Sequence, residues 1–248
     1  MTVSITSSWD DGHVLDLRVA DMLDRYGLTG TFYIARDFLD ERMSDSQLQD
    51  LAQRHEVGAH TLTHPVLTEI SLEQARDEIH GSKIWLEDVL GQEVTSFCYP
   101  KGANNLALQQ IVADAGYVMA RTVDKFTFSV GDNPYCVPTT LQIYPYPLRP
   151  LPRIAFWRGW RSRLQPLLDA LPTLRTFRLG AKTLFNWQVF AESLLQTAAQ
   201  ENGIWHLWGH SWEIERYDLW DALDNILQTV AAYDNSQSVT NSGLITHS

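Results

Sequence analysis

Residues 3–12 read VSITSSWDDG, a β-branched and apolar run that ends in two carboxylates and a glycine. The run predicts a strand near 3–9, and Asp-Asp-Gly predicts the turn that ends it. A second polar pair, His60 and His64, follows another strand-like run near 56–60. Either pair alone also arises by chance, but both pairs follow predicted strands, and this shared position is the stronger signal.

Seven strand-like runs alternate with helical patterns along the chain. Such alternation predicts an α/β fold with a parallel sheet, either open or closed. In barrels of parallel strands the functional residues come from loops at the carboxyl ends of the strands, which is where both polar pairs fall. The expected strands lie near residues 3–9, 30–35, 56–60, 94–99, 117–123, 136–143 and 203–210.

Helix boundaries are also marked in the sequence. Ser71 and Gln74 form a capping box for a helix that Gly91 can end. Asn104 or Asn105 can cap the next helix. Further helices are expected at 13–26, 187–202 and 216–233.

The length and charge of the chain limit its function classes. A chain of 248 residues with 44% hydrophobic residues fits one α/β barrel or at most two small domains, and we expect a single domain over residues 1–248. The net charge of −11 argues against nucleic acid as a partner, because binding to phosphate backbones needs a basic surface. Cys98 and Cys136 do not make a disulfide framework and are expected to be buried as small hydrophobic residues.

The sequence also bears on where the protein is located. The amino terminus enters the first strand without the basic and apolar regions of a secretory signal. No run approaches the roughly 18 apolar residues that span a bilayer. We therefore expect a cytoplasmic protein without stable membrane insertion. The polar residues 234–248 are expected to form a flexible tail.

Residues 145–183 interrupt the alternation of strands and helices. The segment holds eight of the nineteen Lys and Arg residues, and Asp169 is its one acid. One interpretation is an insertion packed on its own aromatic residues. The other is a lid or platform that meets an anionic partner, such as a lipid-phosphate or nucleotide-linked sugar. The aromatic residues are Phe156, Trp157, Trp160 and Phe177.

Asp11, His60 and His64 together supply one carboxylate and two imidazoles. This is a ligand set for a divalent metal ion that leaves coordination positions open. Asp10 stands beside Asp11 as a second carboxylate that can act as a base. A cation, a base and open coordination positions are the parts that metal-assisted hydrolysis needs.

Three motifs occur in the order seen in polysaccharide deacetylases: Asp10-Asp11-Gly12, His60-Thr61-x-x-His64 and Phe97-Cys98-Tyr99-Pro100-Lys101-Gly102. Over residues 3–125 the chain therefore resembles the NodB-homology family, also called carbohydrate esterase family 4. A weaker similarity follows at residues 205–213. The resemblance implies a distorted (β/α)7 barrel and the removal of an acetyl group from an N-acetylated amino sugar.

The resemblance also implies roles for these residues. The metal ion on Asp11, His60 and His64, with zinc expected before cobalt, nickel or manganese, would polarise the carbonyl and lower the pKa of bound water. Asp10 would accept the proton of the water, and a backbone N–H at Lys101 would meet the oxyanion. The wall that faces the substrate would consist of Tyr99, Pro100, Lys101 and Gly102.

One position departs from the family pattern. The usual motif has an Arg where Cys98 stands, and that Arg pairs with the base. Arg121, at the end of the next predicted strand, could reach Asp10 from a neighbouring position. The alternative is that Arg121 is an ordinary surface charge.

The proton donor is expected to be a histidine near the end of the last strand. His210 fits this position, and His206 is the alternative. Glu213 or Asp124 would hold the charged form of the imidazole, which makes a histidine a good acid near neutral pH. The aromatic residues expected to wall the pocket are Trp205, Trp208 and Trp212.

These features predict a metal-dependent deacetylase of an N-acetylated saccharide, small or linked to an anionic carrier. A hydrolase of non-sugar amides, such as ureides or formamides, is the first alternative. A sugar-binding module without turnover is the second.

Overall fold

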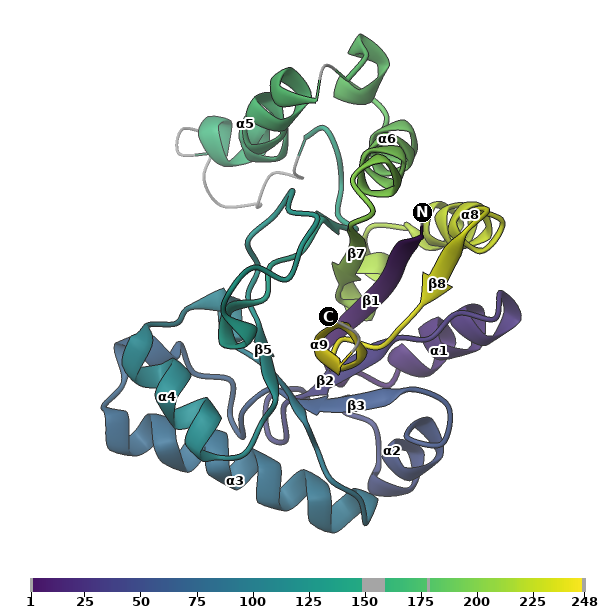
Figure 1. Cartoon of the computed structure of the whole chain (residues 1–248). Helices are drawn as coiled ribbons and strands as arrows, with labels where there is room; N and C mark the ends of the chain where they lie inside the picture. Colours follow the sequence, from purple (N-terminus) through teal and green to yellow (C-terminus); the bar gives the residue numbers. More distant parts are fainter. Residues whose placement is uncertain (1, 149–158, 178, 247–248) are drawn as a thin grey trace.

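The computed structural model describes residues 2–148, 159–177 and 179–246 (Figure 1). Every strand expected from the sequence is present, and all of the strand pairs are parallel. The order in the sheet is β5-β4-β3-β2-β1-β7-β6. The strands are β1 (Val3–Asp11), β2 (Thr31–Ile34), β3 (Glu56–Ala59), β4 (Ser96–Cys98), β5 (Met119–Arg121), β6 (Leu141–Gln142) and β7 (Ile204–Gly209).

The sheet curls so that its two outer strands approach each other. Arg121 of β5 forms a parallel bridge with Val137, which lies just before β6. The Thr122 N–H donates to the Val137 carbonyl at 2.9 Å. The α/β architecture is therefore the distorted (β/α)7 barrel that the family resemblance implies.

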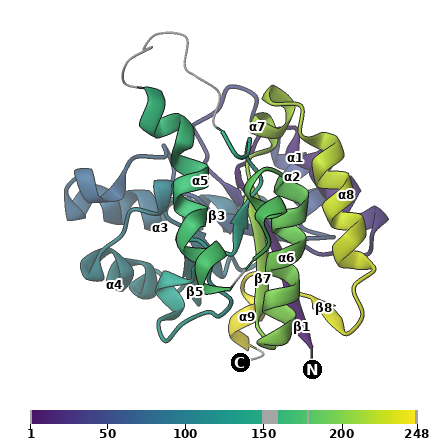
Figure 2. The ribbon, with the colours of Figure 1, turned by 90° about the horizontal axis from the view of Figure 1, so that it is seen from above.

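Helices surround the curled sheet, as the view from above shows (Figure 2). The α-helices are α1 (Asp16–Arg25), α2 (Asp45–Leu51), α3 (Leu72–Leu90), α4 (Leu106–Asp114), α5 (Gly159–Thr176), α6 (Trp187–Gln200), α7 (Ser211–Arg216), α8 (Trp220–Ala231) and α9 (Gly243–Thr246). Short 3-10 helices are η1 (Leu67–Glu69), η2 (Pro100–Gly102), η3 (Pro134–Cys136) and η4 (Ala181–Leu184).

The predicted helix caps are confirmed. The Ser71 hydroxyl accepts from the Gln74 N–H at 3.2 Å, and the Gln74 side chain accepts from the Ser71 N–H at 3.1 Å. Gly91 ends α3 with a left-handed φ of 67°, which a glycine adopts without strain. Asn105 caps α4 by accepting from the Leu108 N–H at 3.0 Å.

Strand β1 has two differently occupied faces because successive side chains point to opposite sides of a strand. One set, which includes Val3, Ile5 and Trp9, is buried in the hydrophobic core. The other set, Thr6, Ser8 and Asp10, is also buried but bonds to Asn241, His206 and Arg121 respectively. The barrel interior beneath the carboxyl end of β1 is therefore polar.

The expectation of a flexible tail after residue 234 is wrong for residues 234–246. Strand β8 (Ser236–Ser238) pairs with residues 3–5 of β1, and α9 follows it. The Thr29 N–H donates to the Ser238 hydroxyl at 2.8 Å, and Asn241 is fully buried. Ser238 and Asn241 thus hold this segment against the barrel, although Gln237 of β8 is exposed.

The predicted insertion at 145–183 is partly described. It contains α5, with Pro166 and Pro172 inside the helix, and η4. Phe177 packs on Phe128, with their ring centroids 5.2 Å apart. Residues 149–158 and 178 lie outside the described residues; they include Arg149, Arg153, Arg158, Arg178, Phe156 and Trp157.

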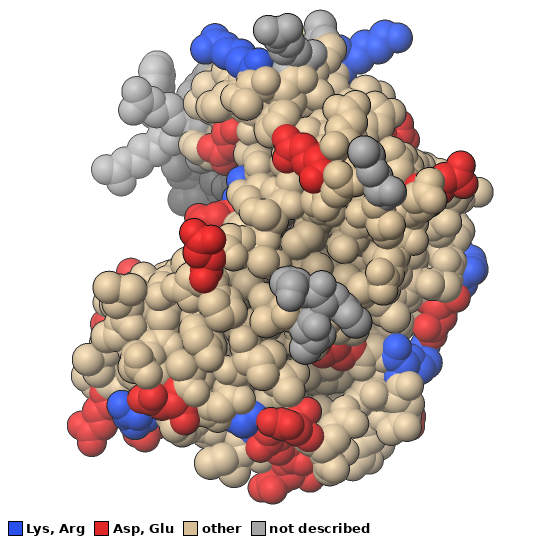
Figure 3. Space-filling model, in the orientation of Figure 1, with Lys and Arg blue, Asp and Glu red and all other residues tan. Residues whose placement is uncertain are grey.

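Charged side chains on the face shown in Figure 3 lie mainly around its edges, with a broad uncharged surface between them. The described residues of this face form no broad basic patch, so it gives no support for binding a nucleic acid backbone. Within the described parts of the chain, none of the helices is long and apolar enough to cross a membrane.

Candidate active site

The carboxyl ends of β1, β3 and β7 meet around a cavity of about 500 Å³. Most of the residues singled out in the sequence line this cavity: Asp10, Asp11, His60, His64, Lys101, Trp208, His210, Trp212 and Glu213. Sequence reasoning missed four further lining residues, which are Phe38, Val123, Lys125 and Gln142.

Three ligand-type atoms converge at the cavity floor. Nε2 of His60 and Nε2 of His64 are 3.1 Å apart. Oδ1 of Asp11 lies 3.7 Å from the first and 3.6 Å from the second. Ligands about 2.1 Å from one ion are themselves about 3.0–3.4 Å apart, so these atoms are close to the spacing that one metal ion requires.

The chemistry of the three donors also fits a divalent cation. Oδ1 of Asp11 is buried and has no hydrogen-bond partner within the described part of the chain. Burial lowers the pKa of His60, and burial together with the neighbouring His60 lowers the pKa of His64 to about 4. Both imidazoles are therefore neutral at physiological pH, which is the form that binds metal ions.

Neighbouring groups fix the orientation of two of these donors. Nδ1 of His60 donates to the Cys98 carbonyl at 2.7 Å, so its Nε2 presents a lone pair to the cavity. The indole N–H of Trp212 donates to Oδ2 of Asp11 at 2.9 Å. This bond leaves Oδ1, the oxygen that faces the histidines, without a competing donor.

The loop between the two histidines is held in an uncommon backbone conformation. Thr61 and His64 have φ values of 71° and 59°, in the left-handed region that non-glycine residues rarely adopt. The Thr61 hydroxyl accepts from the His64 N–H at 3.0 Å and braces the loop. Strain of this kind persists where surrounding contacts enforce it and is concentrated at functional sites.

Glu78 of α3 supplies most of those contacts, and sequence reasoning missed it. Its carboxylate accepts from the N–H groups of Leu62 and Thr63 at 2.8 and 2.9 Å. The Thr63 hydroxyl donates to the same carboxylate at 2.6 Å. One acidic side chain thus holds the middle of the loop that carries both histidines.

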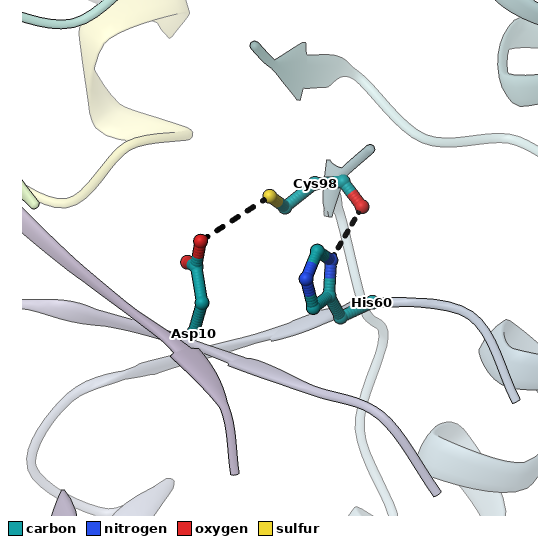
Figure 4. A group of neighbouring side chains, drawn as sticks. All are labelled: Asp10, His60 and Cys98. Atoms are coloured by element: carbon teal, nitrogen blue, oxygen red, sulfur yellow. Dashed lines mark hydrogen bonds between the residues drawn. The ribbon is translucent and has the colours of Figure 1, made fainter. Parts of the chain in front are cut away.

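Asp10, His60 and Cys98 form a second group of ligand-type side chains (Figure 4). Sγ of Cys98 lies 3.9 Å from Oδ2 of Asp10. Burial raises the pKa of the Cys98 thiol well above its ordinary value, whereas a cysteine binds metal as a thiolate. The other oxygen of Asp10 is paired with Arg121, so the group of Asp11, His60 and His64 is the better metal site.

The contact expected between Arg121 and Asp10 is present. Arg121 on β5 is the register partner of Cys98 on β4, and its Nη2 donates to Oδ1 of Asp10. Arg121 is fully buried and is therefore not a surface charge. Burial by itself raises the pKa of Asp10, but the charge of Arg121 and its hydrogen bond to Asp10 oppose this effect, and the pKa lies below its ordinary value.

His210 and His206 occupy different environments. Nδ1 of His210 donates to Glu213 at 2.6 Å, and its Nε2 lies 3.9 Å from Oδ2 of Asp11. Burial by itself lowers the pKa of His210, but the hydrogen bond to Glu213 and the nearby carboxylates raise it to about 9. His210 is therefore protonated at neutral pH, and its partner is Glu213 and not Asp124.

His206 does not line the cavity. It is fully buried, its Nε2 lies 2.8 Å from the Ser8 hydroxyl, and burial lowers its pKa to about 3. It is neutral and cannot donate a proton to a group in the cavity. Trp205 is likewise buried, with its indole N–H on the Ala191 carbonyl at 3.2 Å.

Only Lys101 of the predicted substrate-facing wall lines the cavity. The Tyr99 hydroxyl donates to the Tyr135 carbonyl at 3.1 Å, and Tyr99 and Pro100 are buried. Gly102 packs closely against Val123, which follows β5. A Cβ added at Gly102 would lie 2.8 Å from the Val123 nitrogen. Tyr99, Pro100 and Gly102 therefore support the loop from below instead of facing the substrate.

Residues 2–120 match the family model for polysaccharide deacetylases. The match includes the candidate metal ligands and Asp10, while Arg121 and His210 lie beyond it. A search of curated proteins gives no significant match.

Solved structures share the fold of the whole chain at low sequence identity. A polysaccharide deacetylase-like protein from Mycobacterium smegmatis is 16% identical, with a TM-score of 0.67 over 99% of this chain and 90% of that one. The Xyl-CE4 domain of a multidomain xylanase, from the hindgut metagenome of Trinervitermes trinervoides, is 18% identical, with a TM-score of 0.58 over 100% and 91%. The peptidoglycan deacetylase PdaC from Bacillus subtilis is 18% identical, with a TM-score of 0.55 over 99% and 91%.

Proposed function

Because this chain belongs to the polysaccharide deacetylase family, we propose that it is a metal-dependent hydrolase that removes an acetyl group from an N-acetylated amino sugar. The observation that carries the proposal is the unpartnered, buried Oδ1 of Asp11, which faces the Nε2 atoms of His60 and His64. The ionised Asp10 and the protonated His210 line the same cavity. A base, an acid and a metal ligand set thus share one space.

A divalent ion held by Asp11, His60 and His64 would polarise the acetyl carbonyl and lower the pKa of water. Zinc is our first expectation, and cobalt, nickel or manganese would also suit one carboxylate and two imidazoles. Each of these ions accepts the nitrogen and oxygen donors that the cavity floor presents.

The side chains around that site would carry the proton transfers. Asp10, held ionised by Arg121, accepts a proton from the attacking water, and His210 donates one to the leaving amine. Glu213 keeps His210 in the charged form that this second step needs. The backbone N–H of Lys101 is our proposed donor to the oxyanion, a contact typically worth about 3 kcal/mol.

The substrate that we propose is small or linked to an anionic carrier. The indole rings of Trp208 and Trp212 line the cavity, and aromatic faces suit sugar rings. Two lysines, Lys101 and Lys125, line it as well, although the chain as a whole carries a net charge of −11. Lys125 lies 3.8 Å from Asp169, so α5 packs beside the cavity wall.

Release of acetate from N-acetyl sugars tests the proposal. We expect zinc- or cobalt-loaded protein to release acetate from N-acetylglucosamine, its oligomers or its nucleotide-linked form, and the Asp10→Asn variant to release almost none. Ammonia or formate from ureides or formamides, without acetate, would indicate the non-sugar amide hydrolase instead. Sugar binding without any turnover would indicate a binding module.

The anionic carrier requires a separate test. If the substrate is linked to an anionic carrier, the KM for a nucleotide-linked sugar rises with salt concentration, while the KM for the uncharged sugar stays constant. Equal responses of the two KM values to salt would contradict it.

A further inference from the structure

The polar interior of the barrel includes Asn241, which bonds to Thr6, four residues before Asp10 on β1. All polar groups of this fully buried side chain are bonded. Its Oδ1 accepts from the Thr6 hydroxyl at 2.9 Å, and its Nδ2 donates to the Tyr33 hydroxyl at 2.9 Å. Its backbone N–H donates to the Thr31 hydroxyl at 2.9 Å. Asn241 is therefore fixed against both β1 and β2.

Tyr33 connects Asn241 to the residues around the cavity. It is fully buried on β2, and burial raises the pKa of its hydroxyl well above its ordinary value, so the group stays neutral. Its hydroxyl accepts from Asn241 and lies 3.7 Å from the Met119 sulfur. Its ring packs against the guanidinium of Arg121, with Cζ 5.3 Å from the ring centroid.

Arg121 depends on this packing for its position. Its Nη2 donates to Asp10 and its Nη1 donates to the Thr122 carbonyl at 3.2 Å, but its buried Nε has no partner within the described residues. The Trp208 ring, with its centroid 5.0 Å from Cζ, is the second aromatic contact. An arginine side chain has many rotamers, and the two rings restrict it to the one that meets Asp10.

We propose that Asn241 is a positioning residue for the hydrolytic site: by fixing Tyr33, it holds Arg121 against Asp10. The contacts run in sequence from Asn241 to Tyr33, from Tyr33 to Arg121, and from Arg121 to Asp10. Asp10 lies four residues along β1 from Thr6, which is about 13 Å at the rise of a strand. Through these contacts the segment at residues 239–246 acts on the Asp10 carboxylate. The consequence for turnover rests on the proposed function, whereas the coupling of Asn241 to Arg121 does not.

Steady-state kinetics of Asn241→Ala and Tyr33→Phe test this proposal. Tyr33→Phe keeps the ring and removes only the hydroxyl that Asn241 bonds. We expect kcat to fall about tenfold in each variant, with KM and bound metal changing less than twofold. Gln237→Ala changes an exposed residue of β8, four positions before Asn241; it is the matched control and should leave kcat unchanged.

The Arg121→Met background separates positioning from general destabilisation. It removes the guanidinium and keeps an apolar side chain of similar length. Because Asn241 acts through Arg121, Asn241→Ala should lower kcat no further in this background. The proposal is overturned if kcat falls by the same factor in both backgrounds, or if Asn241→Ala leaves kcat of the otherwise unchanged protein intact.

Urea unfolding of the metal-free protein tests the coupling without any substrate. We expect Asn241→Ala to shift the unfolding midpoint less in the Arg121→Met background than in the wild-type background. Equal shifts would contradict the coupling, even if the protein were an active deacetylase. Unequal shifts with no acetate release would instead retain the coupling and reject the proposed function.

Discussion

The two halves of the barrel contribute differently to the cavity. The first half, up to β5, carries the three candidate metal ligands, Asp10 and Arg121. The second half, from β7 onward, adds Trp208, His210, Trp212 and Glu213 to the cavity lining. It also supports residues of the first half, as in the bonds from Trp212 to Asp11 and from Asn241 to Tyr33. Short local motifs thus supply the candidate reactive groups, while segments distant in the sequence position them.

Asp10→Asn is the strongest test of the first half. The amide cannot accept the proton of the attacking water, so we expect kcat to fall by about 10²–10⁴ while the bound metal remains. Turnover is measured as acetate release and metal by elemental analysis. Activity near that of the wild type would remove Asp10 as the base, whereas loss of the metal would place Asp10 among its ligands.

Glu78→Ala tests whether contacts within the first half hold the metal-binding loop in place. The substitution leaves the N–H groups of Leu62 and Thr63 without their acceptor and loosens the loop between His60 and His64. We expect the affinity for zinc to fall about 10- to 100-fold, as it does when partners of metal ligands are removed. Competition with a chelator measures it.

The matched control for Glu78 is Glu73→Ala, an exposed acid on the same helix that should leave zinc affinity unchanged. Equal losses of affinity in the two variants would show that helix charge, and not the hydrogen bonds to the loop, is responsible.

Trp212→Phe is the corresponding test of the second half. It retains an aromatic ring but removes the N–H that donates to Oδ2 of Asp11. We expect zinc affinity to fall about tenfold, less than in Glu78→Ala, because one hydrogen bond is lost instead of three. Trp220→Phe, whose N–H bonds Glu215 on the surface, serves as the control. A larger loss in Trp212→Phe than in Glu78→Ala would reverse the ranking of the two halves.

The pH dependence of stability tests the pair of His210 and Glu213. The pKa of His210 is about 9 in the folded protein and about 6.5 in an unfolded chain. The folded state therefore holds the proton more tightly, and this stabilisation is complete below about pH 6.5 and disappears as the pH rises to about 9. Between these values the unfolding free energy of the metal-free protein should fall by up to about 1.4 kcal/mol per pH unit from this group.

Urea unfolding at a series of pH values measures this effect, and His210→Gln should lack it. Identical pH profiles for the two proteins would mean that Glu213 does not raise the pKa of His210.

The sequence predicted the fold where the signal is local. The seven strands of the barrel and the caps at Ser71 and Asn105 all depend on residues within a few positions of one another. Strand β8 was missed because Ser-Gln-Ser has no apolar pattern and pairs only through its contacts with β1 and Thr29. Helix α5 was missed because Pro166 and Pro172 argue against a helix.

The residues of the candidate site also divide into those with a local signal in the sequence and those without one. Asp10, Asp11 and the two histidines could be found from spacing, and Arg121 from its place at the strand exit next to Cys98. The bond from Trp212 to Asp11 joins residues 201 positions apart, and no pattern along the chain could indicate it. In the sequence, Glu78 is one of several charged residues on an amphipathic helix. Only the folded structure shows that the loop between the histidines bonds to it.

The central claim is that Asp11, His60 and His64 bind one metal ion. The most direct test is a crystal structure of the zinc-loaded protein with the anomalous signal of zinc located. We predict one ion per chain, about 2.0–2.2 Å from Oδ1 of Asp11 and from the Nε2 atoms of His60 and His64. An ion bound between Asp10 and Cys98, or none at this cavity after loading, would contradict the account.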